Sequence, residues 1–348
     1  VYPIITLVLL LSISKQIHRK TSPMKLDRRP RRLRELSVAK AMIRECSLHK
    51  EDFILPVFVS DHCETKEPIK SMPEVYRWPL DAIVSQIAQW KEIGLNAFAL
   101  FPCVMPQKKC SRGKEAINPH SVSFEAAKKI KQQHQDTLLI ADIALDPFTD
   151  HGHDGILDSS GKVDNDLTVE ILCKSAVIAA QSGFDIVAPS DMMDGRVGEI
   201  RKSLDKAGYE HVAILAYSAK FCSAYYGPFR DAISSSQIEP IDKSGYQLDP
   251  ANHREALLEL KLDEQEGADI LMVKPAEPYL DIIKSAKENS SLPVAAYQVS
   301  GEYSRIWAAS KLGWLELDKC AEESLLGIKR AGADLILTYF AERMIKKL

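Results

Sequence analysis

Two lysines in the sequence each follow an apolar, strand-like segment. Lys220 comes shortly after AILAYS (213–218), and Lys274 comes directly after ILMV. A lysine held at the end of an apolar strand loses hydration, which lowers the pKa of its ammonium group and leaves a neutral amine that can attack a carbonyl carbon. A second cation nearby lowers the pKa of either lysine further. The pair therefore predicts an enzyme that forms Schiff bases, and the alternative is that each lysine forms a buried ion pair with a carboxylate.

Aromatic residues are frequent in YSAKFCSAYY, the sequence around Lys220, whereas Lys274 is followed by Pro275, which has no backbone donor. From closeness in the sequence we expect an apolar, aromatic surrounding for Lys220, which would lower its pKa in the same way as for Lys274. The residues expected around Lys220 are Tyr217, Phe221, Tyr225 and Tyr226.

Other polar side chains come at the ends of the strand-like segments or in the loops after them. Loops rich in Gly, Ser and Pro often serve as lids, and a cation in such a loop can hold a substrate carboxylate. The alternative for these cations is a solvated place on the surface. The residues concerned are the carboxylates Asp142, Asp146, Asp154 and Asp191, the cations Arg230 and Lys243, and the hydroxyl groups of Ser300 and Tyr339.

The segment DPFTDHGHDG (146–155) suits either a metal ion or a charged polar loop. Four acidic groups, at positions 142, 146, 150 and 154, suit a hard cation such as Mg²⁺ better than zinc. His151 and His153 are two residues apart and lack the spacing of a helical zinc pair. The alternative is a polar loop that orients a lysine by hydrogen bonds and ion pairs, and the residue types favour neither reading over the other.

Eight short apolar segments, separated by longer amphipathic ones, predict the framework that positions these groups. Each is nearly continuous in apolar residues, as expected for strands buried on both faces of a parallel sheet. Eight strand–helix units in a chain of 348 residues favour one α/β domain, a single TIM (β/α)8 barrel. No G-x-G-x-x-G follows a strand, which argues against a dinucleotide-binding sheet. The segments lie at 54–59, 97–102, 138–145, 185–190, 213–218, 270–275, 294–300 and 335–340.

The chain is expected to have three regions: a leader (1–23), an N-terminal arm (24–51) and the barrel (52–348). The apolar run at 2–14 is shorter than the roughly 20 residues that span a bilayer. Its basic residues follow the run, whereas those of a signal peptide precede it. We expect natural translation to begin at or near Met24, with a targeting or anchoring segment as the alternative. The Arg- and Pro-rich arm has little core of its own and is expected to pack on a partner subunit.

The composition indicates which partners to expect. The formal net charge is -3, from 45 basic and 48 acidic side chains, so we expect neither nucleic-acid nor membrane binding. Seven cysteines are scattered without a C-x-C or C-x-x-C pair. This argues against a disulfide framework or a thiolate zinc site and indicates the reducing cytoplasm as the location.

Several long strings of the sequence together resemble the porphobilinogen synthase family, also called δ-aminolaevulinic acid dehydratases. They keep the order found in that family and run from the arm to the C-terminus, and none of them is a general feature of barrels. The strings are SMPEVYRW (71–78), ALDPFTDHGHDG (144–155), APSDMMDGRVG (188–198), YSAKFCSAYYGPFRDA (217–232), YQLDPANHREA (246–256), EGADILMVKP (266–275), YQVSGEY (297–303) and GADLILTYF (332–340).

The resemblance implies a lyase that condenses two molecules of 5-aminolevulinate to porphobilinogen, with loss of two waters, in heme or chlorophyll biosynthesis. It implies that Lys274 forms the Schiff base with the first substrate to bind, at the P site, and that Lys220 does so at the A site. By the same resemblance, two cations hold the A-site carboxylate and two hydroxyl groups donate to the P-site carboxylate. These pairs are Arg230 with Lys243, and Ser300 with Tyr339.

The chain departs from the zinc-dependent branch of the family, which has three cysteines where this sequence has Ala144, Asp146 and Asp154. The resemblance is to the aspartate-rich branch, which implies no catalytic Zn²⁺ and an allosteric Mg²⁺ bound in part by Glu259. It also implies a homo-octamer in which the arm embraces a neighbouring subunit.

Two other functions are weighed against this one. A class I aldolase-type Schiff-base lyase on the same barrel would explain the fold and one lysine, but not the second lysine or the paired carboxylate-binding groups. A barrel that has lost catalysis and serves as a binding or assembly protein would not be expected to keep Lys220, Lys274, Ser300 and Tyr339 together.

Overall fold

A computed structural model describes residues 26–233 and 242–348 of the chain. The chain divides into two compact units, one ending at Glu45 and the other running from Cys46 to Leu348. The leader predicted at 1–23 lies outside the described residues. In the second unit, Lys50 donates from Nζ to the carbonyl of Ile93 (3.1 Å), so the chain packs on the barrel shortly before the first strand.

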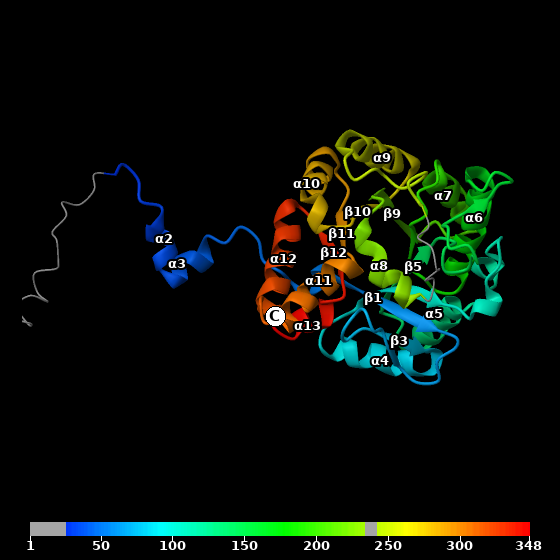
Figure 1. Cartoon of the computed structure of the whole chain (residues 1–348), viewed down its shortest axis with the longest axis horizontal. Coiled ribbons are helices and arrows are strands. Elements are labelled where there is room, and N and C mark those ends of the chain that lie inside the picture. The colour runs from blue at the N-terminus through cyan, green and yellow to red at the C-terminus, as the bar shows by residue number, and fades with distance from the viewer. Residues whose placement is uncertain (1–25, 234–241) are drawn as a thin grey trace, which may run out of the picture. The chain divides into compact units, whose positions relative to one another are not determined.

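A closed barrel of eight parallel strands forms the centre of the second unit (Figure 1). Each strand pairs with its neighbour in chain order, and β12 pairs with β1 to close the barrel. The predicted (β/α)8 barrel is therefore confirmed, and each of the eight predicted segments overlaps one strand. The strands are β1 (Phe53–Ser60), β4 (Ala97–Cys103), β5 (Leu138–Ile143), β8 (Ile186–Pro189), β9 (Ala213–Lys220), β10 (Ile270–Lys274), β11 (Val294–Gln298) and β12 (Leu335–Thr338).

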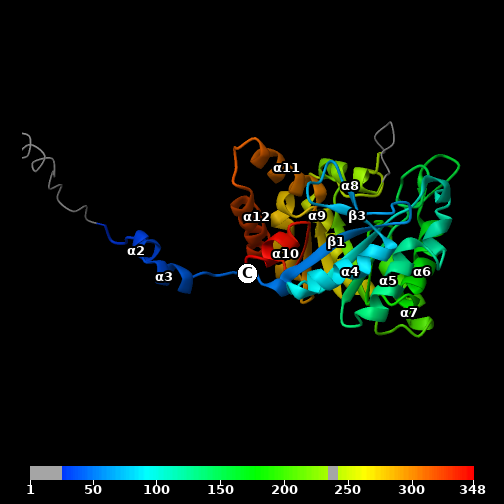
Figure 2. The same ribbon diagram turned by 90° about the horizontal axis from the view of Figure 1, so that it is seen from below.

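Helices surround the barrel on its outside (Figures 1 and 2). In α4 the buried residues Ile83, Val84, Ile87 and Trp90 recur at helical spacing and form one apolar stripe toward the strands. No helix in the described part of the chain is long and apolar enough to cross a membrane. The helices of this unit are α4 (Leu80–Glu92), α5 (Val122–Gln133), α6 (Asn165–Gln181), α7 (Arg196–Lys206), α8 (Gly227–Ala232), α9 (His253–Glu266), α10 (Leu280–Asn289), α11 (Ser300–Lys311), α12 (Leu317–Ala331) and α13 (Ala341–Ile345).

Short elements decorate this barrel. Two strands, β2 (Glu67–Pro68) and β3 (Tyr76–Pro79), extend the sheet beside β1, and β6 (Ile156–Leu157) pairs with β7 (Val163–Asp164). Single 3₁₀ turns are η1 (Lys50–Asp52), η2 (Pro106–Lys108), η3 (Lys114–Ile117), η4 (Ala224–Tyr226) and η5 (Glu277–Tyr279). Of these, η4 and η5 lie after the strands that end in the two lysines.

Three aspartates link neighbouring strands at the N-terminal end of the barrel. Asp185, Asp269 and Asp334 each follow a glycine that ends a helix, and each accepts a hydrogen bond from the first backbone N–H of a neighbouring strand or from the residue next to it. The donors are the N–H groups of Leu139 (2.8 Å), Ile214 (2.7 Å) and Val294 (2.8 Å). The repeated Gly-Ala-Asp and Gly-Phe-Asp sequences therefore both stop a helix and set the register of the next strand.

A bulge interrupts the pairing of β9 with β10. Ala216 pairs with Leu271 and Ala219 pairs with Val273, so three steps along β9 match two steps along β10. A bulge inserts one residue and changes which face of the sheet the following side chains occupy. Beyond the bulge, Lys220 and Lys274 are register partners.

The first unit contains two short helices, α2 (Arg31–Glu35) and α3 (Ser37–Met42). Neither helix buries a residue within this unit. The side chains of Leu36, Val38 and Met42 are 61%, 71% and 79% exposed. The predicted arm therefore presents apolar side chains that its own unit does not cover.

Candidate active site

Lys220 and Lys274 lie side by side at the C-terminal ends of neighbouring strands, β9 and β10, where they are register partners. Both are buried. In a (β/α)8 barrel this end of the strands carries the active site. The structure thus brings together the two lysines on which the predicted chemistry depends.

Lys274 is enclosed by aromatic rings. Its Nζ atom lies 4.6 Å from the ring centroid of Tyr297, 5.0 Å from that of Tyr217, 5.3 Å from that of Tyr226 and 5.4 Å from that of Phe229. Among residues 26–233 and 242–348, no carboxylate forms an ion pair with Lys274. Burial, followed by the charge of Lys220, lowers the pKa of Lys274 to about 7. A substantial share of neutral amine is therefore present near neutral pH, as a Schiff-base nucleophile requires.

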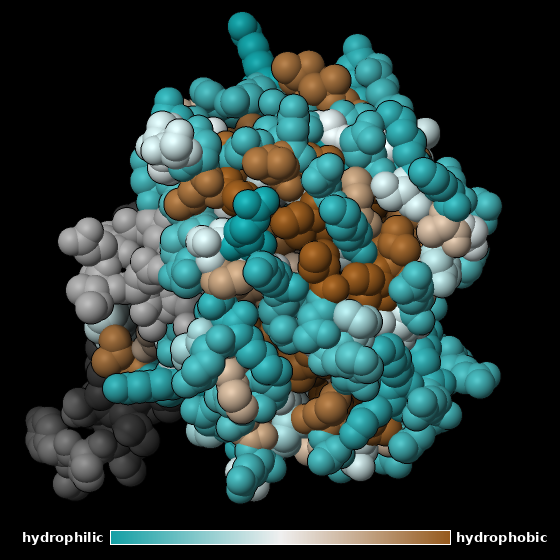
Figure 3. All heavy atoms as spheres, turned by 90° about the vertical axis from the view of Figure 1, so that its right-hand side faces the viewer, coloured by the Kyte–Doolittle hydropathy of each residue, from teal (hydrophilic) through white to brown (hydrophobic). Residues whose placement is uncertain are grey.

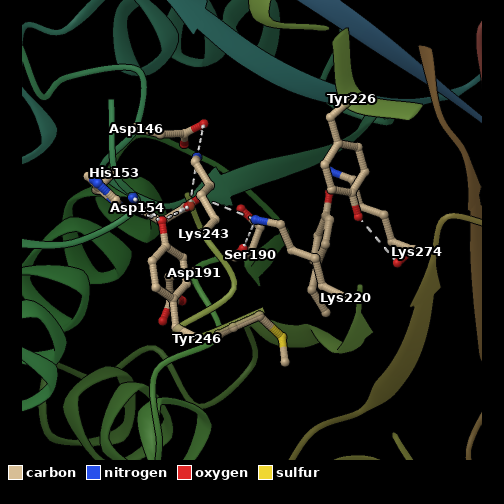
Figure 4. A network of polar contacts seen from close by, with 12 residues as sticks. Asp146, His153, Asp154, Ser190, Asp191, Lys220, Tyr226, Lys243, Tyr246 and Lys274 are labelled. Carbon is tan, nitrogen blue, oxygen red and sulfur yellow. Dashed lines mark hydrogen bonds and ion pairs between the residues drawn. The ribbon is translucent and has the colours of Figure 1, made fainter. Parts of the chain in front are cut away.

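Polar groups surround the ammonium group of Lys220. The prediction that aromatic side chains would surround it was wrong. Its Nζ atom donates to Oδ1 of Asp154 (3.2 Å) and to the carbonyl of Ser190 (Figure 4). The rings of Tyr217 and Tyr226, expected beside Lys220, face Lys274 instead. The two lysines therefore differ: Lys274 is desolvated by rings, and Lys220 is held by a carboxylate.

Asp154 is the carboxylate that joins Lys220 to the loop after α8. Its Oδ2 lies 2.8 Å from Nζ of Lys243 and accepts a hydrogen bond from the hydroxyl of Tyr246 (2.9 Å). Although burial raises the pKa of Asp154, the charges of Lys220 and Lys243 and these hydrogen bonds hold it well below its ordinary value. Asp154 is therefore ionised throughout the neutral range.

The other three predicted carboxylates lie around this group. Asp146 is 3.7 Å from Nζ of Lys243. Burial, then the charge of Asp146, raises the pKa of Asp142 to about 7, although the charge of Lys274 acts in the opposite direction. Burial also raises the pKa of Asp191 to about 6, against the charge of Arg196, whose Nε lies 3.9 Å away. Asp142 is thus the carboxyl whose protonation is most closely linked to that of Lys274.

Lys243 reaches inward to Asp154 and Asp146, and its side chain is only 11% exposed. It is therefore not a solvated surface charge. Arg230 lies in α8, near enough for its charge to act on the pKa of Lys243. The two cations expected to hold one carboxylate are therefore close enough for their charges to interact.

Ser300 and Tyr339 border the aromatic cage of Lys274. The backbone N–H of Phe229, whose ring belongs to the cage, donates to Oγ of Ser300 (2.9 Å). The hydroxyl of Tyr339 is 2.9 Å from that of Tyr297, the ring closest to Lys274. Two hydroxyl groups thus lie next to the rings that enclose Lys274, the lysine with which no carboxylate of the described residues forms an ion pair.

Asp146 and Asp154, in the loop 146–155, lie against lysine side chains. In the described part of the chain, no group of three or more His, Cys, Asp or Glu side chains is arranged to hold a metal ion. Ammonium groups of Lys220 and Lys243 lie against Asp154, and that of Lys243 lies near Asp146. These contacts are those expected of a polar loop that orients lysines.

Glu259 lies on α9, in the wall of a cavity of about 800 Å³ that Asp194 and Glu255 also line. Burial raises its pKa to about 7. The charge of Arg196 acts against that rise, whereas the carboxylates of Asp263, Asp194 and Glu255 add to it. Negative charge is therefore concentrated at this point of the outer surface.

Tyr246 and Tyr297 are site residues that the sequence did not single out. Tyr246 fixes Asp154 through its hydroxyl, and Tyr297 bridges Lys274 and Tyr339. Each lies in a string that was noted for other reasons, YQLDPANHREA and YQVSGEY. Tyr297 could have been found from its position, because it is an aromatic residue near the C-terminal end of β11, three residues before Ser300.

Comparison with known proteins gives consistent matches over nearly the whole chain. A family model described as delta-aminolevulinic acid dehydratase matches residues 27–347. The chloroplastic delta-aminolevulinic acid dehydratase of Physcomitrium patens is 49% identical over 322 residues, which are 92% of this chain and 74% of that protein. The enzyme of the same name from Bradyrhizobium diazoefficiens is 47% identical over 320 residues, 92% of this chain and 90% of that protein.

A solved structure agrees with these matches. It is the crystal structure of delta-aminolevulinic acid dehydratase (porphobilinogen synthase) from Toxoplasma gondii in complex with the reaction product porphobilinogen. The TM-score is 0.91 at 44% sequence identity, and the match covers 93% of this chain and 92% of the other.

Proposed function

Because the chain belongs to the delta-aminolevulinic acid dehydratase family and catalyses the synthesis of porphobilinogen from 5-aminolevulinate, we propose that Lys274 and Lys220 bind the two substrate molecules as imines. The observation that carries this proposal is the register pairing of the two lysines. An aldolase-type lyase needs one such amine, whereas joining two keto acids is served by two amines side by side. Holding both substrates in fixed orientation supplies much of the rate acceleration.

Lys274 is assigned to the P site. Its ring-lined surrounding favours the neutral amine, which attacks the C4 ketone of one 5-aminolevulinate and forms an imine with loss of one water. Ser300 and Tyr339, which border the same cage, donate hydrogen bonds to the carboxylate of that molecule. The P site thus combines one nucleophile with neutral donors.

Lys220 is assigned to the A site. It forms the second imine, again with loss of one water, while Arg230 and Lys243 bind the carboxylate of the second molecule. Asp154, which holds both Lys220 and Lys243, keeps the imine-forming nitrogen and the carboxylate-binding cation at a fixed separation. The A site is thus the charged half of the pair.

Ring formation follows from these two imines. A protonated imine withdraws electrons, so a base can remove a proton from the adjacent carbon, which then forms the C–C bond to the other substrate. This bond forms to the imine carbon of the other substrate, and the amino nitrogen of that other substrate attacks the first imine carbon and closes the ring. Each lysine amine leaves as a proton is lost from a neighbouring carbon, which makes the ring aromatic. Asp142, whose pKa is raised to about 7 by burial and by Asp146, is suited to receive and return such protons.

Borohydride trapping tests the lysine assignments. Reduction in the presence of 5-aminolevulinate, followed by peptide mapping, should place the adduct on Lys274 at low substrate and on both lysines at high substrate. Incubation without substrate is the control for non-specific modification. Recovery of the unmodified peptides around both lysines after complete loss of activity would contradict the proposal.

The rate of trapping at Lys274 should depend on pH. Because burial and Lys220 lower the pKa of Lys274 to about 7, the fraction of neutral amine rises as the pH rises toward this value and then levels off. We expect the rate to increase about tenfold per pH unit below that value and to be nearly constant above it. A rate that keeps rising to the ordinary lysine pKa of 10.5 would show that the amine is not desolvated.

An allosteric Mg²⁺ is proposed at Glu259. The crowded carboxylates of Asp194, Glu255 and Asp263 support it, since a cation would relieve their repulsion. Mg²⁺ commonly binds through one or two carboxylates and keeps several waters, so Glu259 with Glu255 or Asp194 would suffice. No catalytic Zn²⁺ is proposed, because ammonium groups lie against Asp146 and Asp154.

Replacement of Glu259 by Gln should remove most of the stimulation by added Mg²⁺ and leave the activity in EDTA unchanged. The amide keeps the size of the side chain but not the charge that attracts the ion. The measurement is the initial rate of porphobilinogen formation against Mg²⁺ concentration, with Glu264→Gln on the same helix as the control. Equal Mg²⁺ curves for Glu259→Gln and the unaltered enzyme would remove Glu259 from the site.

A homo-octamer is proposed, with the arm of one subunit packed on a neighbour. The apolar side chains of α2 and α3, which their own unit leaves exposed, support such packing. Apolar side chains also gather on the outer face over α6, shown in Figure 3, where Val169, Val177 and Ile178 line a cavity of about 1060 Å³. Light scattering of the full chain measures the number of subunits.

A reducing compartment is proposed as the location, with the cytoplasm as the default. All seven cysteines are free in the structure. The relatives from Physcomitrium patens and Arabidopsis thaliana are named chloroplastic, which leaves an organelle as the alternative. Imaging of the full chain fused to a fluorescent protein at its C-terminus distinguishes the two.

A further inference from the structure

Glu302, in the first turn of α11, is a buried carboxylate whose partners are backbone N–H groups. Its Oε2 accepts hydrogen bonds from the N–H groups of Val299 (2.6 Å) and Ala276 (3.3 Å), and its Oε1 accepts one from Glu277 (2.6 Å). No lysine or arginine in residues 26–233 and 242–348 forms an ion pair with it. Burial raises the pKa of Glu302, whereas the N–H groups of Val299 and Ala276 lower it by favouring the ionised form, in which both oxygens accept hydrogen bonds.

These hydrogen bonds join two loops that each carry a P-site group. Ala276 and Glu277 follow closely after Lys274, and Val299 directly precedes Ser300. The β10 loop therefore cannot move along the barrel without breaking its bonds to Glu302, and the same carboxylate holds the residue before Ser300. Glu302 itself contacts the backbone of these loops and is not one of the residues of the ring cage around Lys274.

The first turn of α11 is also held from its other side. A Cβ atom added at Gly301 would lie 2.4 Å from the carbonyl oxygen of Tyr225 and 2.8 Å from its Cα, so the two backbones are in close contact. Ser300 donates from Oγ to the same carbonyl (3.4 Å) and accepts from the N–H of Phe229 (2.9 Å). The first turn of α11 therefore lies between the β10 loop and η4. The contact of Gly301 with the backbone of Tyr225 limits how far Ser300 can shift.

We propose that Glu302 is a positioning residue that fixes the separation between the amine of Lys274 and the hydroxyl of Ser300, and so selects 4-oxo acids by chain length. In 5-aminolevulinate two methylene groups separate the ketone from the carboxylate. If Lys274 binds the ketone and Ser300 the carboxylate, the distance between these residues matches one chain length only. This inference rests on the P-site roles proposed above and adds what sets their spacing.

A change of Glu302 to Gln alters the spacing without altering any group that touches substrate. The amide presents one acceptor oxygen in place of two, and its NH₂ group faces an N–H donor of one of the two loops. The loop that loses its acceptor is released from α11. A displacement of about 1 Å in a bound substrate group is sufficient to reduce the rate of a reaction by roughly a hundredfold.

The experiment measures imine formation at Lys274 with two keto acids, 4-oxopentanoate and 5-oxohexanoate, which differ by one methylene group. Both lack the amino group of 5-aminolevulinate, so they can form the imine but cannot form porphobilinogen. Full-length enzyme is reduced with borohydride at a series of concentrations of each acid, and the adduct on the Lys274 peptide is quantified. The unaltered enzyme should favour 4-oxopentanoate by roughly ten- to 200-fold, the range in which one methylene is discriminated. In Glu302→Gln this preference should fall by about tenfold or more.

Asp334→Asn is the matched control. Its carboxylate also accepts a backbone N–H bond, from Val294 (2.8 Å), and it forms an ion pair with Lys287 (2.7 Å), but it lies at the opposite end of β11 from Ser300. This variant makes the same acid-to-amide change at a carboxylate that accepts a backbone N–H, and it loses the charge that pairs with Lys287 in addition, yet it should keep the preference for 4-oxopentanoate. General loosening of the barrel would lower the preference in both variants alike and would overturn the inference.

The remaining outcomes are distinct. Absence of an adduct on Lys274 in the unaltered enzyme would refute the proposed P site itself, whereas a normal adduct with unchanged selectivity in Glu302→Gln would refute only the role of Glu302. Should Glu302→Gln fail to fold, Glu302→Asp keeps the charge and shortens the side chain. An unchanged preference in the aspartate variant would equally overturn the inference.

Discussion

Replacement of Lys274 by Ala is expected to abolish porphobilinogen formation, with a loss on the order of 10⁴- to 10⁶-fold, as for removal of other covalent nucleophiles. The physical reason is specific to this site. No other amine in the described part of the chain lies within the cage of Tyr217, Tyr226, Phe229 and Tyr297. The measurement is the initial rate of porphobilinogen formation at saturating 5-aminolevulinate.

The same change should leave the fold intact. A buried ammonium with a lowered pKa is unfavourable to the folded state at neutral pH, so its removal relieves desolvation while it opens a cavity. Lys274→Met keeps most of the volume and should be at least as stable to heat as the unaltered enzyme, yet equally inactive. An active Met variant would show that the amine of Lys274 takes no part in the reaction.

Asp154→Asn is expected to have the second largest effect, on both stability and activity. It removes the carboxylate from between the ammonium groups of Lys220 (3.2 Å) and Lys243 (2.8 Å) and leaves both cations without their shared partner. Breaking a buried ion pair in this way typically lowers the free energy of unfolding by about 3–5 kcal/mol. Activity should fall with it, because Lys220 and Lys243 are the two lysines proposed to bind the A-site substrate.

The pH dependence of this stability difference has a definite sign. Ion pairs hold the pKa of Asp154 below the ordinary 3.8 in the folded chain, so its stabilisation is present above that value and is lost progressively as the pH falls below it. Urea unfolding of Asp154→Asn and of the unaltered enzyme should therefore differ most near neutrality and converge at acid pH. A constant difference from pH 7 to pH 3 would contradict the ion-pair account.

An exposed ion pair provides the control. Asp136 contacts Lys91 with its side chain 78% exposed, so Asp136→Asn makes the same acid-to-amide change where solvent screens the charges. Surface pairs of this kind contribute roughly 0–1 kcal/mol. A similar loss of stability in both variants would show that the position of Asp154 between two lysines has no special effect.

The fold was largely predictable from the sequence because each strand is a nearly continuous apolar run. Buried parallel strands such as Leu271–Val273 leave no polar face, and glycines such as Gly267 and Gly332 mark where the preceding helices end. The ends of strands were less predictable. The segment proposed at 294–300 is a strand only to Gln298, because Val299 and Ser300 turn into α11.

The sequence was sufficient to predict which residues gather at the candidate site, but not which of them contact one another. Lys220, Lys274 and the carboxylates could be located because a barrel brings all strand ends to one face. Which rings lie beside which lysine depends on pairing between strands that are far apart in the chain. Tyr217 is three residues from Lys220 and yet contacts Lys274, and Tyr297 comes from another strand altogether.

The bulge in β9 has a consequence for how such an enzyme can arise. With strict alternation, residues three apart such as Tyr217 and Lys220 would occupy opposite faces of the sheet, and Ala219 instead of Lys220 would be level with Lys274. One added residue turns a second amine into the barrel beside the first. A one-residue insertion in a strand is thus enough to bring a second amine level with the first at the mouth of a barrel.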